Sequence, residues 1–185
     1  MKKLPALLLS LLLAASIGSV GAQGLRAEVG KPLQQASDLL KAGKAKEALA
    51  KVREAEAALR QRITGNVAEV PEIAAWREAY RRFGAKPSEH RSAIEALTRR
   101  VLKPDQLPAI NTLVDIGNLV SIQHLLPAGA HPTDAIRQPL ELRLARAGDQ
   151  FAPPDGSPVE TPPVGEVVFA EGAQVLTRRW TWRQA

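Results

Sequence analysis

Hydrophobic side chains recur every three or four residues along the first two-thirds of the chain, which is the spacing of amphipathic helices. Glycine or proline follows most of these stretches, as is typical of helix ends. The pattern predicts helices over residues 31–42, 44–62, 71–84, 88–103 and 107–126. Gly43 joins the first two, which are predicted to form an antiparallel hairpin.

Beyond Pro127 the hydrophobic period shortens to two residues, as in β-strands. The alternation predicts strands over 140–145, 166–172 and 174–184, with a short hairpin turn between the last two. A loop rich in proline and glycine, residues 151–165, separates the first two strands. Helices that come first and strands that come later predict an α+β fold rather than βαβ repeats.

The first 22 residues have the order of a secretory signal peptide. Lys2 and Lys3 precede an apolar run, and small residues lead up to Ala22. We expect cleavage after Ala22 and export to the periplasm. The alternatives are an uncleaved membrane anchor and a cytoplasmic protein whose gene start is misassigned. No later apolar run in the sequence is long enough to cross a bilayer.

The same patterns predict how the rest of the chain is organised. We expect a helical hairpin within residues 23–62, a linker over 63–71 and a main domain over 72–185. The hairpin segment LLKAGKAKEALAKVREAEA resembles one tetratricopeptide unit, and no second copy follows at that family's period. This resemblance implies a surface for a protein partner; a generic helical hairpin is the alternative.

The charge balance favours a polyanionic partner. The chain has 25 Lys and Arg residues against 19 Asp and Glu, a formal net charge of +6. It has no cysteine, which excludes disulfides, thiol catalysis and cysteine-based zinc sites. Its three histidines lack metal-ligand spacing, and neither a phosphate-binding glycine loop nor a serine-nucleophile motif is present. We predict neither a metal nor a cofactor.

A polar stripe interrupts the apolar helix predicted over 107–126. Asn111, Asp115 and Asn118 fall on one face of it. Such a stripe can hydrogen-bond a base, a ribose or a substrate. Alternatively, Asn111 caps the helix and Asp115 fixes a neighbouring loop. The sequence leaves both interpretations open.

Basic residues concentrate in two neighbouring helices and in the last strand. Arg91, Glu95 and Arg99 are four residues apart, so Glu95 is either a general acid–base carboxylate or part of an exposed ion-pair ladder. The last strand interleaves arginine with tryptophan, a mixture that stacks bases; a buried tryptophan face has the same pattern. The candidates for contact with RNA or substrate are Arg91, Arg99, Arg100, Asn111, Asn118, Arg178, Arg179 and Trp180.

Hydrolysis would require a side chain that activates water. The catalytic candidates are Glu95, Asp115 and His131, the last in a loop rich in glycine and proline. An inert loop histidine is the alternative for His131.

Several separated segments within residues 70–185 resemble the B3/B4 domain and follow the order of that family. These segments are WREAYRRFGAKPSEHRSAIEALTRRVL, LPAINTLVDIGNLVSIQHLLPAGAH, LELRLARAGDQF, GEVVFAEG and VLTRRWTWRQ. The domain is a module of the phenylalanyl-tRNA synthetase β subunit, where it hydrolyses mischarged tyrosyl-tRNA. The resemblance implies helices packed on a small sheet, a polar stripe that borders a cleft, and tRNA or aminoacyl-tRNA rather than DNA as the partner.

Two departures limit what the resemblance carries over. In an alignment on Pro127, Gly129 stands where the synthetase domain has a histidine, and His131 lies two residues later. No aminoacylation domain is present, so the chain is not a complete phenylalanine–tRNA ligase. The resemblance implies a tRNA-binding module and a candidate trans-acting deacylase. The alternative, from the signal and the hairpin, is an exported interaction module without catalysis.

Overall fold

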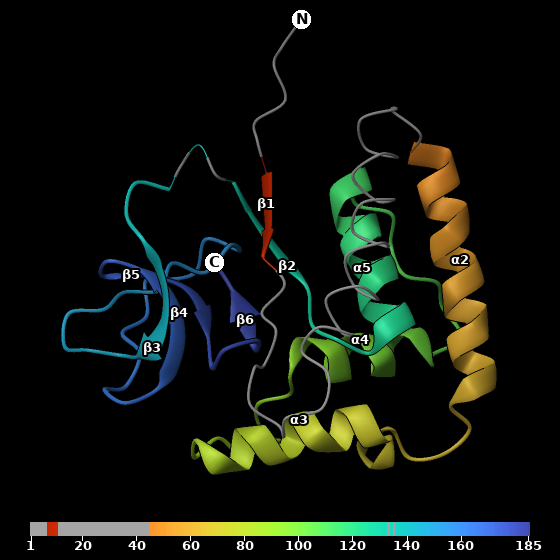
Figure 1. Cartoon of the computed structure of the whole chain (residues 1–185), viewed down its shortest axis with the longest axis horizontal. Helices are drawn as coiled ribbons and strands as arrows, with labels where there is room; N and C mark the ends of the chain where they lie inside the picture. Colours follow the sequence, from red (N-terminus) through yellow and green to blue (C-terminus); the bar gives the residue numbers. More distant parts are fainter. Residues whose placement is uncertain (1–6, 11–44, 133, 135) are drawn as a thin grey trace, which may run out of the picture. The chain divides into compact units, whose positions relative to one another are not determined.

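The computed structural model of the chain describes residues 7–10, 45–132, 134 and 136–185. Its helices are α2 (Ala45–Arg62), α3 (Pro71–Arg82), α4 (Ala93–Val101) and α5 (Thr112–His124), with a 3-10 helix η1 (Val67–Glu69) (Figure 1). Its strands are β1 (Leu7–Ser10), β2 (Gly129–Pro132), β3 (Leu140–Leu144), β4 (Val167–Glu171), β5 (Gln174–Arg178) and β6 (Arg183–Gln184). The predicted helix 31–42 and most of the predicted signal peptide lie outside the described residues.

Contacts between residues divide the chain into two compact units. The sheet unit contains Ala74–Ala93 and His131–Ala185, together with Leu7–Leu9. The helical unit contains the described residues from Ser10 to Ile73, and Ile94–Ala130. The predicted α+β class is confirmed. None of the helices in the described part of the chain is long and apolar enough to cross a membrane.

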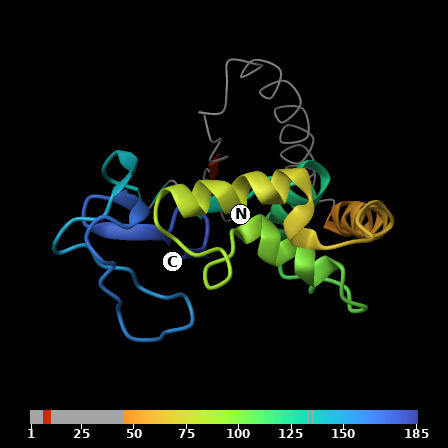
Figure 2. The ribbon, with the colours of Figure 1, turned by 90° about the horizontal axis from the view of Figure 1, so that it is seen from below.

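The sheet unit is built on four antiparallel strands in the order β3-β4-β5-β6. Gly172, at a φ of 56°, makes the tight turn between β4 and β5, as the sequence predicted. The predicted long loop between β3 and β4 is also present, and Figure 2 shows it extending away from the strands. One face of the sheet carries a core of Ala145, Phe151, Val168, Ala170 and Val175.

The prediction of one continuous strand over residues 174–184 is wrong for the central residues. β5 ends at Arg178, and the chain resumes as β6 only at Arg183. Arg179 and Trp180 between them have φ values of 45° and 63°, in the left-handed region that strands do not use. Alternating hydrophobicity does not report a turn of this kind, because neither residue is a glycine.

Helix α3 contributes its aromatic face to the sheet unit. The predicted stripe is confirmed at Trp76 and Tyr80, both buried, and Gly84 follows the helix at a φ of 80°. The Tyr80 hydroxyl is 2.9 Å from Oγ1 of Thr181, so the helix is hydrogen-bonded to the segment between β5 and β6.

Helix α2 is an integral part of the helical unit. Its predicted apolar stripe is confirmed by the burial of Val52, Ala55 and Leu59, and it packs along α5. Nε of Arg60 donates to the carbonyl of Val101, the last residue of α4, at 2.7 Å. The expected linker 63–71 contains η1 (Val67–Glu69), and Val67 is buried there.

Two helix starts differ from the predicted ones. Ser88 lies in a turn, and α4 begins at Ala93 instead. Helix α5 begins at Thr112, because Asn111 has extended backbone angles and caps it; residues 107–110 are not helical. Leu125, at a φ of 51°, ends α5 before Pro127.

Candidate functional site

Because of the turn at Arg179 and Trp180, the side chains of Trp180 and Trp182 lie in different surroundings. Trp180 meets Trp76 of α3 edge-on, with 5.2 Å between ring centroids. Trp182 meets His90 edge-on at 4.6 Å. Trp180 and Trp182 do not lie on one strand face, so the alternative of a single buried tryptophan face is wrong. Only Trp182 is placed beside the charged groups that follow.

Two glutamates from the long β3–β4 loop hold the arginines of β5 and β6. Arg178 donates to both carboxylate oxygens of Glu166 at 2.8 Å and also to Glu160. Arg183 donates to the other oxygen of Glu160 at 2.7 Å, and Arg179 lies 3.2 Å from Glu166. A bidentate arginine–carboxylate pair fixes both side chains in one plane. We call Arg178, Arg179, Trp182 and Arg183, with Glu160 and Glu166, the Arg–Trp cluster.

The pKa shifts in the cluster follow from these contacts. The hydrogen bond from Arg183, helped by Arg178, holds the pKa of the Glu160 carboxyl below its ordinary value. The hydrogen bond to Glu166 raises the pKa of Arg178. Burial lowers the pKa of Arg179, against the attraction of Glu166. Glu160 and Arg178 are therefore fixed in their charged forms across the physiological range.

The cluster has more positive than negative charge, and the excess lies beside Trp182. Three guanidinium groups face two carboxylates, so one positive charge is not neutralised within the cluster. Arg179 stacks over Trp182 with its guanidinium carbon 4.8 Å from the ring centroid, and Arg183 lies 5.4 Å from that centroid. Arg179 makes the longest of these ion pairs.

A second basic surface lies at the end of α3, also in the sheet unit. Arg77, Arg81, Lys86 and Ser88 line a shallow hollow of about 400 Å³ around Gly84. Arg81 pairs with the exposed Glu78 at 3.2 Å, and Lys86 pairs with the exposed Glu89 at 3.3 Å. Exposed pairs of this kind are weak and screened by salt, so these cations can exchange partners.

Two members of the polar stripe in α5 have structural contacts. The Asn111 side chain accepts from the Val114 backbone N–H at 3.0 Å and so caps α5. Asp115 is buried and accepts from the Ile110 N–H at 3.4 Å, which fixes the segment before the helix. Asn118 is half-buried. The structural interpretation of the stripe is confirmed for Asn111 and Asp115.

Glu95 lies in the helical unit together with Arg99 and Arg100. It is fully buried, and Arg99 donates to its Oε1 through both Nε and Nη2 at 3.0 Å. The interpretation of Glu95 as part of an exposed ladder is therefore wrong, because its carboxylate is inside the protein. Arg100 is exposed, and so is Arg91, which belongs to the sheet unit.

His131 is in strand β2 rather than in the predicted loop. It is buried, its ring centroid is 5.6 Å from that of Phe169, and burial lowers its pKa. The predicted site residues are thus divided between the two units. The expectation that the polar stripe borders a cleft stays a prediction.

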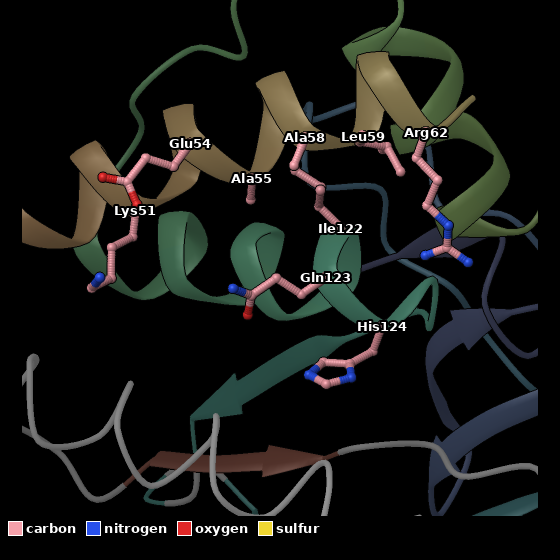
Figure 3. A pocket seen from close by; sticks show the side chains of 9 residues that line it. All are labelled: Lys51, Glu54, Ala55, Ala58, Leu59, Arg62, Ile122, Gln123 and His124. Atoms are coloured by element: carbon pink, nitrogen blue, oxygen red, sulfur yellow. The ribbon is translucent and has the colours of Figure 1, made fainter. Parts of the chain in front are cut away.

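A hollow in the helical unit lies between α2 and α5 and measures about 570 Å³ (Figure 3). Ala55, Ala58, Leu59 and Ile122 give it an apolar floor. The polar side chains at its rim are Lys51, Glu54, Arg62, Gln123 and His124. The rim carries charges of both signs, so it does not favour a polyanion.

Sequence reasoning missed the acidic half of the Arg–Trp cluster. Glu160 lies in the predicted loop, whose proline and glycine content indicates only an irregular connection, and Glu166 was expected to begin the strand after it. Trp182 was visible in the sequence, and its separation from Trp180 depends on the turn. The available signal was the run of arginines itself, because buried arginines require acidic partners somewhere in the chain.

Among the residues that the structure describes, four α-helices and a four-stranded antiparallel sheet place the chain in the α+β class. The family model of the B3/4 domain matches residues 75–185, well over half of the chain, and the chain belongs to this family. The family is associated with tRNA binding. No curated protein and no solved structure matches the chain. The matched range contains the Arg–Trp cluster and α5, and α2 lies before it.

Within the described residues, no three His, Asp or Glu side chains lie close enough together to hold a metal ion. The groups that the Arg–Trp cluster presents are guanidinium groups, carboxylates and the ring of Trp182.

Proposed function

We propose that the chain is an RNA-binding B3/4 module whose partner is tRNA or aminoacyl-tRNA, and that the Arg–Trp cluster contributes to the binding surface. The observation that carries the proposal is an excess of positive charge on an aromatic ring inside the matched range, where Arg179 lies over Trp182. Arginine and aromatic side chains together bind single-stranded segments of RNA, with cations on phosphates and rings on bases.

The basic hollow at the end of α3 extends the same proposal. Arg77, Arg81 and Lys86 belong to the sheet unit and add cations for a phosphate backbone. The glutamate partners of Arg81 and Lys86 are exposed, so releasing these two cations costs little. Arg178 is different, because its five guanidinium donors are largely used by Glu160 and Glu166. We assign Arg178 the role of positioning the loop glutamates rather than binding RNA.

Deacylation of a mischarged tRNA is a finer proposal that rests on the family resemblance. Glu95 and Asp115 are buried and hydrogen-bonded within the protein, and His131 is buried beside Phe169. A general base must reach the water or proton on which it acts. We therefore keep binding as the proposed function and treat deacylation as a separate readout of the same experiment.

The test compares two arginines of equal charge in the sheet unit. Purified chain is titrated with tRNA across a series of salt concentrations, and Arg179→Gln is compared with Arg137→Gln. Arg137 lies beside Glu171, at the far end of β4 from Glu166. One lost phosphate contact should reduce the log–log salt slope by about 0.7–0.9 in Arg179→Gln, with little change in Arg137→Gln.

Equal effects of the two variants would mean that only bulk charge matters and would contradict the assigned surface. Absence of tRNA binding at about 50 mM salt would contradict the RNA function, since electrostatic binding is strong there. The exported interaction module would then be the better account. Release of the amino acid from aminoacyl-tRNA, measured in the same samples, tests the deacylase proposal independently.

A further inference from the structure

Strand β3 is an edge of the four-stranded sheet, and it carries exposed leucines. The sheet order places β4 on one side of it, and no described strand pairs with its other side. Leu142 is 44% exposed and Leu144 is 60% exposed, which is high for leucines in a strand. An open edge with apolar side chains can pair with another strand.

The backbone bonds show which residues face that open edge. Ala145 N–H donates to the Glu166 carbonyl at 2.7 Å, one step beyond the register pair Leu144↔Val167. Hydrogen-bonded pairs alternate along an antiparallel ladder, so Arg143 and Glu141 also bond towards β4. The N–H and C=O groups of the even-numbered residues, with Leu142 at the centre, therefore face outwards.

The sequence of β3 complements its own antiparallel copy. Its five residues read Leu-Glu-Leu-Arg-Leu over Leu140–Leu144. A two-fold axis at Leu142 places Glu141 of each copy opposite Arg143 of the other, and Leu140 opposite Leu144. Opposite charges and apolar pairs across strands both stabilise a sheet. A two-fold interface requires this kind of self-complementarity.

Arg143 has a donor suited to this arrangement. Its two Nη groups donate to the Asp149 carboxylate and the Gly172 carbonyl at 2.5–2.9 Å. Its buried Nε makes no hydrogen bond; it lies 3.5 Å from the Glu141 carboxylate of the same strand. The Leu144 carbonyl already accepts from Arg143 Nη1 at 3.0 Å. A carbonyl has two lone pairs, so it can still accept from a second strand.

We propose that β3 is a self-association surface, on which a second copy of this chain pairs antiparallel with Leu142 opposite Leu142. The pairing joins two four-stranded sheets into one of eight strands. The contact is short, so the dimer is weak and depends on protein concentration. It involves neither the Arg–Trp cluster nor RNA, and it stands independently of the proposed function.

The register gives a sharp test, because the chain contains no cysteine of its own. The full chain with Leu142→Cys should form a symmetric disulfide dimer under mild oxidation. Its two Cα atoms would lie about 5.5 Å apart in a hydrogen-bonded pair, within the roughly 4.4–6.8 Å that a disulfide spans. Leu144→Cys is the matched control, because its two copies would be offset by about 13 Å along the strands.

A charge variant tests the same interface without a cross-link. Glu141→Lys places a lysine opposite Arg143 twice in each dimer, so the dissociation constant measured by sedimentation should rise about tenfold or more. Glu141→Gln should have a smaller effect. Val159→Lys replaces a valine of 59% exposure outside β3 and should change nothing.

Equal cross-linking of Leu142→Cys and Leu144→Cys would overturn the register. A full chain that sediments as a monomer at about 100 μM, with Leu142→Cys remaining monomeric under oxidation, would overturn the self-association. Circular dichroism of each cysteine variant shows that it is folded, and both leucines are exposed enough to be replaced without loss of core.

Discussion

Among single side chains, His131 makes the stability of the sheet unit depend on pH. Burial beside Phe169 lowers the pKa of its imidazole, whereas the unfolded chain has the ordinary value near 6.5. Burial, assisted by Arg179, also lowers the pKa of His90. Between the folded and unfolded pKa values the unfolded state binds more protons. The contribution of these histidines to the free energy of unfolding is therefore fully present above about pH 6.5, and it falls as the pH drops towards their folded pKa values.

We predict that His131→Gln flattens this dependence, because glutamine does not titrate. The urea midpoint, measured at pH 7.5 and 5.5, should fall less on acidification in the variant than in the parent chain. His90 should leave a residual slope. His124→Gln, at the end of α5, is the matched control and should keep the parental difference. If His131→Gln and the parent chain lose equal stability, burial of His131 is not what couples folding to pH.

The roles of individual residues could be predicted only where they depend on near neighbours in sequence. The capping role of Asn111 was one of two interpretations, and it rests on a bond to Val114, three residues away. Glu95 was visible as a partner of Arg99, but its burial was not, because burial depends on segments distant in sequence. The turn at Arg179 was invisible, because its positive φ occurs at residues that rarely adopt one.

Among the helices, α2 is held by a buried carboxylate that the hydrophobic pattern does not reveal. Glu56 is fully buried, accepts from the Leu107 N–H at 2.9 Å and binds Arg53 at 2.9 Å. Arg53 in turn donates to the Leu107 carbonyl at 2.7 Å. The pair therefore satisfies both backbone groups of one residue in the segment between α4 and α5, where no regular ladder exists.

Glu56→Gln should destabilise the chain by about 2 kcal/mol, because it leaves Arg53 without its charge partner and weakens the bond to Leu107. This cost is lower than for a fully buried pair, because Arg53 is 26% exposed and partly solvated. Glu54→Gln makes the same chemical change two residues earlier, at an exposed position, and should stay within about 0.5 kcal/mol of the parent. Equal urea midpoints for the two variants would show that the Glu56 contacts contribute nothing.

The elements themselves were predicted well wherever their periodicity was long. Helix α2 matches its predicted range within one residue, since an 18-residue segment with a regular apolar stripe leaves little ambiguity. β3 and β4 lie within one residue of their predicted ranges, but their burial does not alternate as expected: Leu142 and Leu144 of β3 are exposed, and the three central residues of β4 are all buried. The start of α4 was wrong because Ser88, a good capping residue in isolation, lies in the turn before the helix. The pairing of β6 with β5 depends on the intervening turn and had no sequence signal.

For the whole molecule, the matched family range and the contacts do not coincide. The match begins at residue 75, yet α2 lies before it and packs along α5 inside the helical unit. Arg60 adds bonds to the carbonyls of Val101, Lys103 and Asp105. The B3/4 family match therefore describes a part of the chain whose helices are completed by a segment outside it. The predicted boundary at residues 63–71 remains a prediction.

Limited proteolysis tests that boundary and the role of α2 together. Gly65 is exposed and has no neighbouring atom within 4 Å of an added Cβ, so we expect the first cut there. The two fragments should nevertheless co-elute in size-exclusion chromatography, because Arg53, Glu56 and Arg60 hold α2 to residues 101–107. In the nicked Glu56→Gln chain the fragments should separate at lower urea, whereas nicked Glu54→Gln should behave as the parent. Fragments that separate at once in buffer would show that α2 is a loosely attached module. A chain that resists cleavage near Gly65 would show that no boundary exists there.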